Sequence, residues 1–199
     1  VGAVDAARRQ DHMQQHTGQH LLSAVFLDAF GYATVSVHFG ADACTLDLAV
    51  PQLAPGAAAE VERLANARVA EDRPVTVTFE DAATVEGLRR PSARGGTLRI
   101  VTIAGVDRSA CGGTHVASTG AIGPVLVRRV ERVKQGTRVE FVCGARAVAR
   151  SRAEWEALRA VGDVLRGGVG DVAARATAQV EAVRAARAEG DRLRRALVE

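Results

Sequence analysis

The sequence contains few cysteines and no long apolar run. Its 199 residues include only three cysteines, Cys44, Cys111 and Cys143, and such an odd, low count argues against a disulfide framework. No apolar run approaches the ~20 residues of a membrane-spanning helix, and the N-terminus has no signal-peptide pattern. A hydrophobic content of 47% with 25% charged residues is typical of a soluble globular protein. We therefore expect a cytoplasmic protein with no membrane partner.

Lysine is nearly absent too, since Lys134 is the only one among 26 basic residues. The formal net charge of +3 is a mild excess. It is compatible with RNA binding but does not by itself indicate it. The length allows one well-packed core with an appendage.

Two short motifs carry most of the chemical information. His16-Thr17-Gly18-Gln19-His20 lies near the start, and Cys111-Gly112-Gly113-Thr114-His115 follows about ninety residues later. Each offers two metal-binding side chains four positions apart, and together they make the His₃Cys set of a tetrahedral zinc site. A lone HxxxH occurs by chance and is usually ordinary helix surface or core. The companion CxxxH motif makes a site for one zinc ion the stronger interpretation.

The two motifs require different local structures. Apolar residues recur at three- and four-residue intervals from about Arg8 to Phe30, which predicts a helix that Gly31 ends. Residues four apart share one helical face, so the two histidines of the first motif would project side by side. The two consecutive glycines of the second motif favour a tight loop.

The rest of the first 148 residues predicts an α+β fold with a mostly antiparallel sheet and packed helices. Cys44 and Cys143 lie in apolar runs and are expected to be buried, reduced thiols. Strands are expected over residues 34–39, 44–50, 74–79, 97–104, 124–133 and 138–142, with the fourth leading directly into the Cys111 turn. One helix is expected from Pro55 to about Glu71. A second, short helix is expected to begin after Asp81, which would cap it, and to end at about Arg90.

The composition changes from about Ala145 to a long helical pattern. We therefore predict two domains, residues 1–148 and a helical arm of residues 149–199, with a break at the glycines near 167–170. A heptad-like stripe runs from Val169 to Leu197, interrupted by Gln179 and Gly190. It fits either a solvated helix or a coiled-coil arm for self-association. Both chain ends are abrupt, so we expect a piece of a larger protein.

The motifs also carry a family resemblance. HTGQHLLS and ACGGTHVASTGAIG resemble the editing domain of alanyl-tRNA synthetase and, more closely, the alanyl-tRNA editing proteins of the AlaX family. The stretches VDAARRQDHMQQHT, SVHFG, TLDL and RVEFVCGARA support this likeness, which covers roughly residues 4–148. The superfamily also contains the threonyl-tRNA synthetase editing domain, but the GGT of the second motif favours the alanyl branch.

The resemblance implies an activity. Members hydrolyse the ester between a wrong amino acid and tRNA(Ala), chiefly serine and in some members glycine, so the chain is expected to be a trans-acting deacylase with mischarged tRNA(Ala) as its partner. Longer members carry a β-barrel before this domain, and a helical arm and a further domain after it. We expect this chain to lack the barrel and to stop within the arm. It also has Gln19 where many relatives have threonine.

The resemblance further implies roles for individual residues. The zinc ligands would be His16, His20, Cys111 and His115. Candidate catalytic residues are Thr17, Gln19 and His38, although Gln19 and His38 could equally be ordinary surface residues. Candidate substrate contacts are Gly112, Gly113 and Thr114. Candidate RNA contacts are Arg8, Arg9, Arg128, Arg129 and Arg138, each of which could instead be solvated surface.

Two mechanisms and two alternative functions stay open. Zinc could activate a water for attack on the ester, or it could hold the substrate while other groups position the water. Four protein ligands normally close a tetrahedral site, which favours the second version. The alternatives to a trans-acting enzyme are a zinc-stabilised, non-catalytic module that binds tRNA or a partner, and a cis-editing fragment of a synthetase. A cleft beside the metal would favour an enzyme, and a fully buried metal a structural module.

Overall fold

The computed structural model describes residues 2–198. Their contacts divide the chain into two compact units, Val1–Val148 and Ala149–Glu199. Each unit is described by itself. The possible metal-binding side chains all lie in the first unit, which is α+β as predicted.

A long helix, α1 (Ala6–Phe30), forms the centre of the first unit. Its first turn is capped by the Asp5 carboxylate, which accepts the N–H of Arg8 at 3.0 Å. It ends at Gly31, whose left-handed conformation (φ 69°) lets its N–H bond back to the carbonyls of the last turn. The predicted helix and its glycine stop are thus confirmed, with the start two residues earlier.

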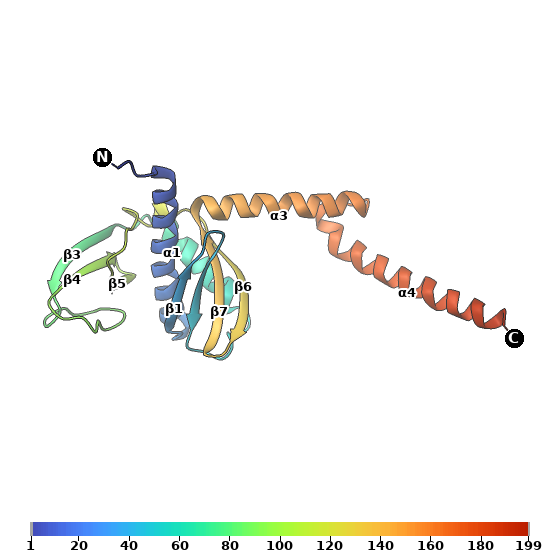
Figure 1. Ribbon diagram of the computed structural model, residues 1–199, viewed down its shortest axis with the longest axis horizontal. Coiled ribbons are helices and arrows are strands. Elements are labelled where there is room, and N and C mark those ends of the chain that lie inside the picture. The colour runs from blue at the N-terminus through green and yellow to red at the C-terminus, as the bar shows by residue number, and fades with distance from the viewer. Residues whose placement is uncertain (1, 199) are drawn as a thin grey trace. The chain divides into compact units, whose positions relative to one another are not determined.

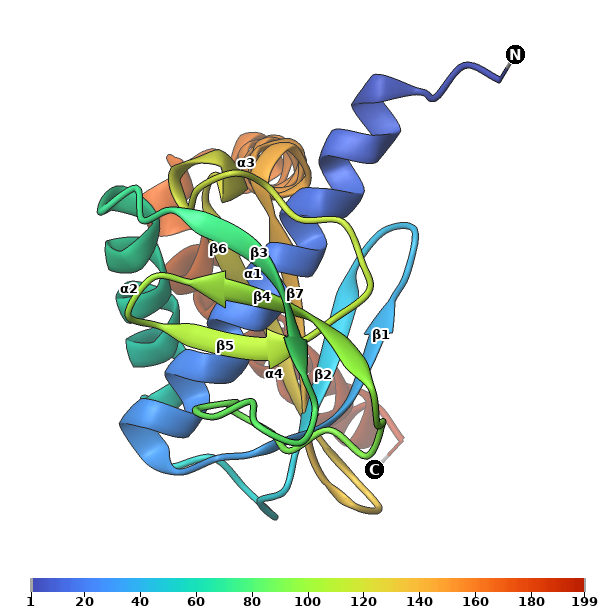
Figure 2. The same cartoon turned by 90° about the vertical axis from the view of Figure 1, so that its left-hand side faces the viewer.

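Two antiparallel sheets lie on opposite sides of α1 (Figures 1 and 2). The four-stranded sheet has the order β1-β2-β7-β6, with strands Thr34–Phe39, Cys44–Leu48, Gly136–Cys143 and Val125–Val133. The three-stranded sheet has the order β3-β4-β5, with strands Val75–Asp81, Thr97–Ile103 and Asp107–Ala110. A second helix, α2 (Ala57–Ala70), packs against α1 and β6. Four of the expected strands form the antiparallel pairs β1-β2 and β6-β7.

The position of α1 between the sheets explains its burial. Residues from Thr17 to Phe26 are all buried, without the polar face of a surface helix. Gly18 is needed for the close approach of β7, because a Cβ at this position would lie 2.2 Å from the Cys143 Sγ atom. The glycine in the first motif therefore serves packing rather than flexibility.

The core fills the space between α1, α2 and the four-stranded sheet. Its largest fully buried side chains include Phe26, Phe141 and Ile122. Cys44 and Cys143 belong to this core as free cysteines, and burial raises the pKa of both thiols. The prediction that they are buried and reduced is confirmed. Such protonated thiols are inert and serve as small apolar side chains.

The predicted helix from Asp81 to Arg90 is wrong. Asp81 is the last residue of β3, and its side chain caps a turn rather than a helix. Gly87 then adopts a left-handed conformation (φ 69°), which a continuing helix does not allow. The N–H of Arg89 donates to the Arg108 carbonyl at 2.8 Å. The segment is therefore a turn followed by irregular chain that is tied to β5.

The segment before Cys111 also differs from its prediction. The expected strand 97–104 does not lead directly into the Cys111 turn, because β4 ends at Ile103 and β5 runs back beside it. The short β5 was missed because its two buried positions hold Asp107 and Ser109. Polar residues at buried positions remove the apolar alternation by which a strand is recognised.

The second unit is helical. It contains most of α3 (Gly144–Val164), a short 3₁₀ turn, η2 (Val169–Asp171), and α4 (Val172–Ala196). The chain leaves α3 through Arg166, which has a positive φ of 55°, close to the predicted glycine break. No residue of α4 is buried. Among the described residues, no helix combines the length and the apolar character that crossing a membrane requires.

Candidate metal centre

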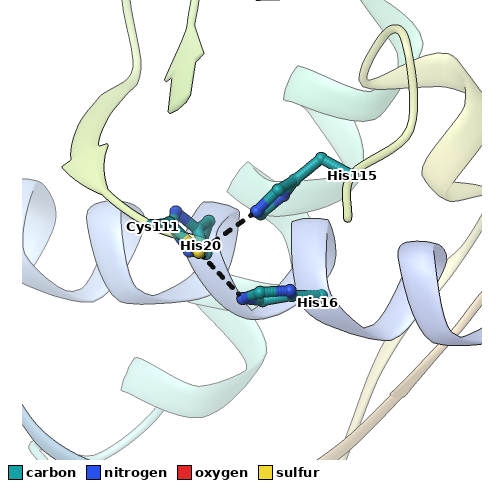
Figure 3. Close-up of side chains that lie close together, drawn as sticks. All are labelled: His16, His20, Cys111 and His115. Atoms are coloured by element: carbon teal, nitrogen blue, oxygen red, sulfur yellow. Dashed lines mark hydrogen bonds between the residues drawn. The ribbon is translucent and has the colours of Figure 1, made fainter. Parts of the chain in front are cut away.

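The two motifs meet at one point of the first unit. One ligand atom from each of four side chains lies within 4.8 Å of the other three, and the four residues are His16, His20, Cys111 and His115. The Cys111 Sγ atom lies 3.4 Å from the Nε2 atoms of both His16 and His115. Figure 3 shows these rings converging on the sulfur. The structure thus brings together all four side chains that the sequence singles out as ligands.

The helical half of the cluster follows from the geometry of α1. His16 and His20 are one turn apart, and their ring centroids are separated by 5.2 Å. The His115 ring approaches both, with centroids at 4.2 Å from His16 and 4.7 Å from His20. His20 is buried at 5% exposure, whereas His16, Cys111 and His115 are partly exposed. Three of the four side chains are therefore partly accessible to solvent.

The loop half is held by Arg99 of β4. The Arg99 Nη1 atom donates to the carbonyls of Cys111 (2.7 Å) and Gly113 (2.8 Å), while the Arg99 carbonyl accepts the N–H of Cys111 at 3.0 Å. Three hydrogen bonds to one residue fix an otherwise irregular turn. The N–H of Gly113 points back to the Cys111 Sγ atom at 3.4 Å.

The two glycines of the loop have different roles. A Cβ at Gly113 would lie 2.1 Å from the Cε1 atom of His16, so only glycine lets the loop reach the ring. A Cβ at Gly112 would meet nothing within 4 Å. Gly112 is exposed, and no hydrogen bond within residues 2–198 involves its N–H. Its N–H is therefore available to a ligand.

His20 is oriented by a buried charged network. Its Nδ1 atom lies 2.8 Å from the Asp107 Oδ2 atom, which leaves Nε2 for the cluster. The Asp107 side chain is fully buried, and its other oxygen accepts the Arg89 Nε–H at 2.6 Å. The Ser109 hydroxyl contacts both Asp107 oxygens at 3.0–3.1 Å. A carboxylate behind a histidine is the usual support of a metal-binding imidazole.

His115 is oriented by a hydroxyl. Its Nδ1 atom lies 3.1 Å from the Thr17 Oγ1 atom, which also accepts the N–H of Val116 at 3.1 Å. Thr17 is fully buried. When His115 uses Nε2 toward the cluster, Nδ1 carries the proton and donates it to this hydroxyl. The predicted catalytic candidate Thr17 thus contacts a member of the cluster.

The electrostatics of the cluster favour a bound cation. Burial raises the pKa of the Cys111 thiol, but hydrogen bonds from His115, His16 and His20 outweigh burial and lower this pKa to about 3. A thiolate is the form of cysteine that binds metals. Burial lowers the pKa of His20, but the Asp107 carboxylate opposes burial and leaves this pKa raised. Negative charge from Asp107 thus stabilises positive charge at the cluster.

Two cavities flank the cluster. The first, called the His16 cavity, has about 310 Å³ and is lined by nine residues: His12, Gln15, His16, Phe39, Gly40, Cys44, Gly113, Thr114 and Arg146. The second, called the His20 cavity, has about 300 Å³ and includes Gln19, His20, Arg89 and Ser109 in its lining. A wider hollow of about 600 Å³ lies along Leu27, Asp28 and Arg108 and includes none of the four cluster residues. Both flanking cavities are near the ~300 Å³ lower end of small-molecule sites.

The other predicted site residues are distributed around the cluster. Gly113 and Thr114 line the His16 cavity, whereas Gln19 lines the His20 cavity and donates to the Ser23 hydroxyl at 2.8 Å. His38 pairs with Thr45 across β1 and β2 and lies on the outer face of the sheet, opposite the cluster. Within residues 2–198, no hydrogen bond joins Gln19 or His38 to the cluster.

The predicted RNA contacts lie on the four-stranded sheet and at the start of α1. On the outer face of the four-stranded sheet, Arg138 forms an ion pair with Asp47 at 2.7 Å and Arg129 with Glu131 at 3.0 Å. Arg128 lies at a bulge of β6. Two further candidates, Arg8 and Arg9, are exposed at the start of α1.

Several residues of the centre were not found from the sequence. Asp107 and Arg99 lie on strands, and only their pairing with the motifs in space reveals them. Phe39 is next to the predicted His38, but it faces the cluster, with its ring centroid 5.2 Å from that of His16. Alternation with the partly buried Val37 was the one available signal for Phe39.

The class of domain follows from a comparison with known families. Residues 98–140, which include the second motif, match the family described as "Threonyl and Alanyl tRNA synthetase second additional domain".

Individual proteins similar to this chain are alanyl-tRNA editing proteins and alanine–tRNA ligases. The chain is 34% identical over 151 residues to the alanyl-tRNA editing protein Aarsd1 of Danio rerio, covering 73% of this chain and 37% of the relative. It is 35% identical over 151 residues to the Bos taurus protein of the same name, covering 73% and 34%. It is 35% identical over 177 residues to the alanine–tRNA ligase of Pyrococcus abyssi, covering 83% and 19%. The chain thus spans less than half the length of each of these relatives. The predicted resemblance to alanyl-tRNA editing proteins is confirmed.

Proposed function

We propose that this chain hydrolyses the ester of mischarged tRNA(Ala), chiefly Ser-tRNA(Ala) with Gly-tRNA(Ala) as a second substrate, as a trans-acting proofreading enzyme of the cytoplasm. The observation that carries the proposal is the convergence of three imidazoles and a cysteine sulfur beside a cavity. The names of the relatives, an alanyl-tRNA editing protein and an alanine–tRNA ligase, supply the substrate class.

Zinc is the metal that fits the four donors. Nitrogen and sulfur ligands in a tetrahedral set are typical of zinc. With Zn–N near ~2.0 Å and Zn–S near ~2.3 Å, two tetrahedral ligands are separated by roughly 3.5 Å. The Cys111 Sγ atom lies 3.4 Å from two imidazole nitrogens, in agreement with this separation. When bound, zinc supplies a Lewis acid that holds or polarises a polar group of the substrate.

The protein groups define a path for the ester. His16 is the ligand that lines a cavity together with Gly113 and Thr114, so the aminoacyl group enters on this side. The available N–H of Gly112 is the donor for the oxyanion that develops at the ester carbonyl. Asp107 and Thr17 act through the histidines that they orient. Gln19 and His38 stay predictions from the sequence.

Discrimination between serine and alanine depends on a single hydroxyl. Polar groups that require this hydroxyl are left unpaired when alanine binds, and such sites discriminate by ~10⁴ or more. The exposed Thr114 side chain lines the His16 cavity and is a candidate partner. We therefore place the recognition of the serine hydroxyl at Thr114 and the metal.

Two alternatives remain distinguishable. A structural metal site would be buried without a cleft, whereas three ligands here are partly exposed and cavities lie on both sides. Cis-editing within a synthetase uses the same pocket, and relatives of both names match at similar identity. For self-association we propose the heptad-like stripe of the second unit, on which Val183 and Leu193 of α4 are exposed.

The test is a deacylation assay with metal analysis on the same sample. Ser-tRNA(Ala) and Ala-tRNA(Ala) are incubated separately with the chain and with the variant Cys111→Ala. Hydrolysis of the seryl ester alone, lost together with zinc in the variant, supports the proposal. Bound zinc without hydrolysis of either tRNA or of a small seryl-adenosine ester would contradict it. The small ester removes any dependence on contacts to the body of the tRNA.

A further inference from the structure

An aromatic side chain lies exposed beside the metal cluster. Phe39 is 46% exposed, although the sequence is only 4% aromatic. Its ring meets the His16 ring edge to face, with centroids 5.2 Å apart and an interplanar angle of 67°. An exposed phenylalanine leaves apolar surface in water that a ligand can cover.

The backbone around Phe39 is held rigidly. Phe39 is the last residue of β1 and pairs with the fully buried Cys44, so it faces inward. The next residue, Gly40, has both backbone groups bonded. Its N–H donates to the Ala43 carbonyl at 3.0 Å, and its carbonyl accepts the Arg146 Nη1–H at 2.8 Å. The backbone that carries the ring is therefore fixed on both sides by pairing and hydrogen bonds.

Arg146 is itself fixed by charge. Its Nε and Nη2 atoms donate to the two Asp11 carboxylate oxygens at 2.7 and 2.6 Å. A bidentate pair of this kind has a defined orientation and holds its geometry better than a single contact. Asp11 lies on α1, five positions before His16. The same helix thus anchors, through Arg146, the backbone next to Phe39 and carries His16 of the cluster.

The cavity beside this ring has room for a planar group. Phe39 and His16 form part of the wall of the His16 cavity of about 310 Å³. His12 and Thr114 add groups able to form hydrogen bonds at the same opening, and both are exposed. A flat, partly polar ligand of nucleobase size matches an aromatic wall with a polar rim.

We propose that Phe39 is the stacking surface for the terminal adenine of the aminoacylated tRNA, an inference that rests on the proposed function. Every tRNA ends in an adenosine whose ribose carries the amino acid, so the base and the ester belong to one nucleoside. A base on Phe39 holds that ester next to His16. Stacking on an aromatic ring does not distinguish one base from another. No such distinction is needed here, because the last base is the same in every tRNA.

A second exposed phenylalanine provides a matched control. Phe79 on β3 is 70% exposed and is not among the residues that line the His16 cavity. Removing its ring changes exposed aromatic area without changing the cluster. Phe39→Tyr keeps a stacking face and Phe39→Ala removes it.

The first experiment measures binding rather than catalysis. The zinc-loaded chain is titrated with the trinucleotide CCA, and saturation transfer to the adenine protons is recorded by NMR. Phe39→Ala should weaken binding by roughly 5- to 100-fold, the range of one base–aromatic stack, while Phe39→Tyr and Phe79→Ala should bind like wild type. Equal binding by wild type and Phe39→Ala would overturn the inference, as would the absence of transfer to adenine.

The second experiment separates the inference from the proposed function. Hydrolysis of seryl-adenosine is compared with hydrolysis of serine ethyl ester, which has no base. Phe39→Ala should raise KM for the adenosine ester and leave the ethyl ester unchanged. Hydrolysis with the same KM in wild type and Phe39→Ala overturns the adenine site and leaves the deacylase standing. Binding of CCA through Phe39 without hydrolysis of either ester overturns the deacylase and leaves the adenine site standing.

Discussion

His16 and His20 stand on a helix that is buried between two sheets, whereas Cys111 and His115 stand on an irregular loop. The helix sets the spacing of its pair by hydrogen bonds of its own backbone. The loop has no such ladder and depends on Arg99 for its shape. One half of the candidate metal centre thus lies on regular secondary structure, and the other half lies on a loop shaped by tertiary contacts.

Each half nevertheless depends on the other for its orientation. Asp107, four residues before Cys111, orients the helical His20, and the helical Thr17 orients His115 of the loop. The helical histidine is therefore oriented from the strand that precedes the loop, and the loop histidine is oriented from the helix. This crossing explains how two segments of different regularity produce one set of donors, and the following variants test it from the largest expected effect to the smallest.

Gly113→Ala should have the largest effect on metal affinity. The new Cβ would lie 2.1 Å from His16, so a ligand must move. We expect a greater loss than the roughly 10- to 100-fold that a change behind a ligand produces. Gly112→Ala is the matched control because its Cβ meets nothing. Competition with a chelator of known zinc affinity measures both, and equal affinities would contradict the close packing of loop and helix.

Asp107→Asn should weaken zinc binding by about 10- to 100-fold, because the carboxylate orients His20 and increases its basicity. The same chelator competition measures this effect. Asp28→Asn, at an exposed position of α1, is the control and should bind as wild type. An affinity that Asp107→Asn leaves unchanged would mean that His20 needs no support from the β5 side.

Thr17→Val should reduce zinc affinity less than Asp107→Asn, because it removes a neutral partner rather than a charged one. It also leaves the buried N–H of Val116 without its acceptor, which costs about 1–3 kcal/mol of folding free energy. Zinc competition and urea unfolding measure the two effects. If Thr17→Val binds zinc more weakly than Asp107→Asn, then His115 of the loop depends more on its orienting partner than His20 of the helix does.

Asp47→Asn should have the smallest effect and none on zinc, because its ion pair with Arg138 lies on the outer sheet face. The hydrogen bond from Arg138 lowers the pKa of Asp47. Stability from a lowered carboxyl pKa is present above the unfolded pKa of ~3.9 and is lost as the pH falls through the folded value. The difference in urea midpoint between wild type and variant should therefore be small at pH 7 and vanish in acid. If the difference in urea midpoint persists in acid, it arises from packing and not from the ion pair.

The sequence predicted the parts of this site that follow from local periodicity. The register of His16 and His20 comes from helical spacing, and the Cys111 loop comes from two glycines. Asp107 could not be predicted because it is a buried polar residue on a strand, and its partner His20 lies 87 positions away. His38 was predicted because the resemblance places its strand beside the pocket, but strand alternation directs the neighbouring Phe39 toward the cluster.

The expected helix from Asp81 to Arg90 failed for a related reason. An aspartate before a stretch without proline is a common helix start, but the same side chain caps turns equally well. Pairing of Arg89 with β5 decided the outcome, and this contact is formed only in the folded sheet. Local signals therefore sufficed where the backbone bonds to itself and failed where it bonds across the sheet.

The separation of the two motifs has a consequence during synthesis. Cys111 follows His16 by 95 positions, and ribosomes add roughly 5–20 residues per second. The histidine pair therefore emerges roughly 5–20 seconds before the thiolate and the Asp107 that supports it. A nascent chain presents only two of its four donors during this interval, so the first half can hold a metal ion only loosely. Selection of the correct ion is thus postponed until the second half has been translated.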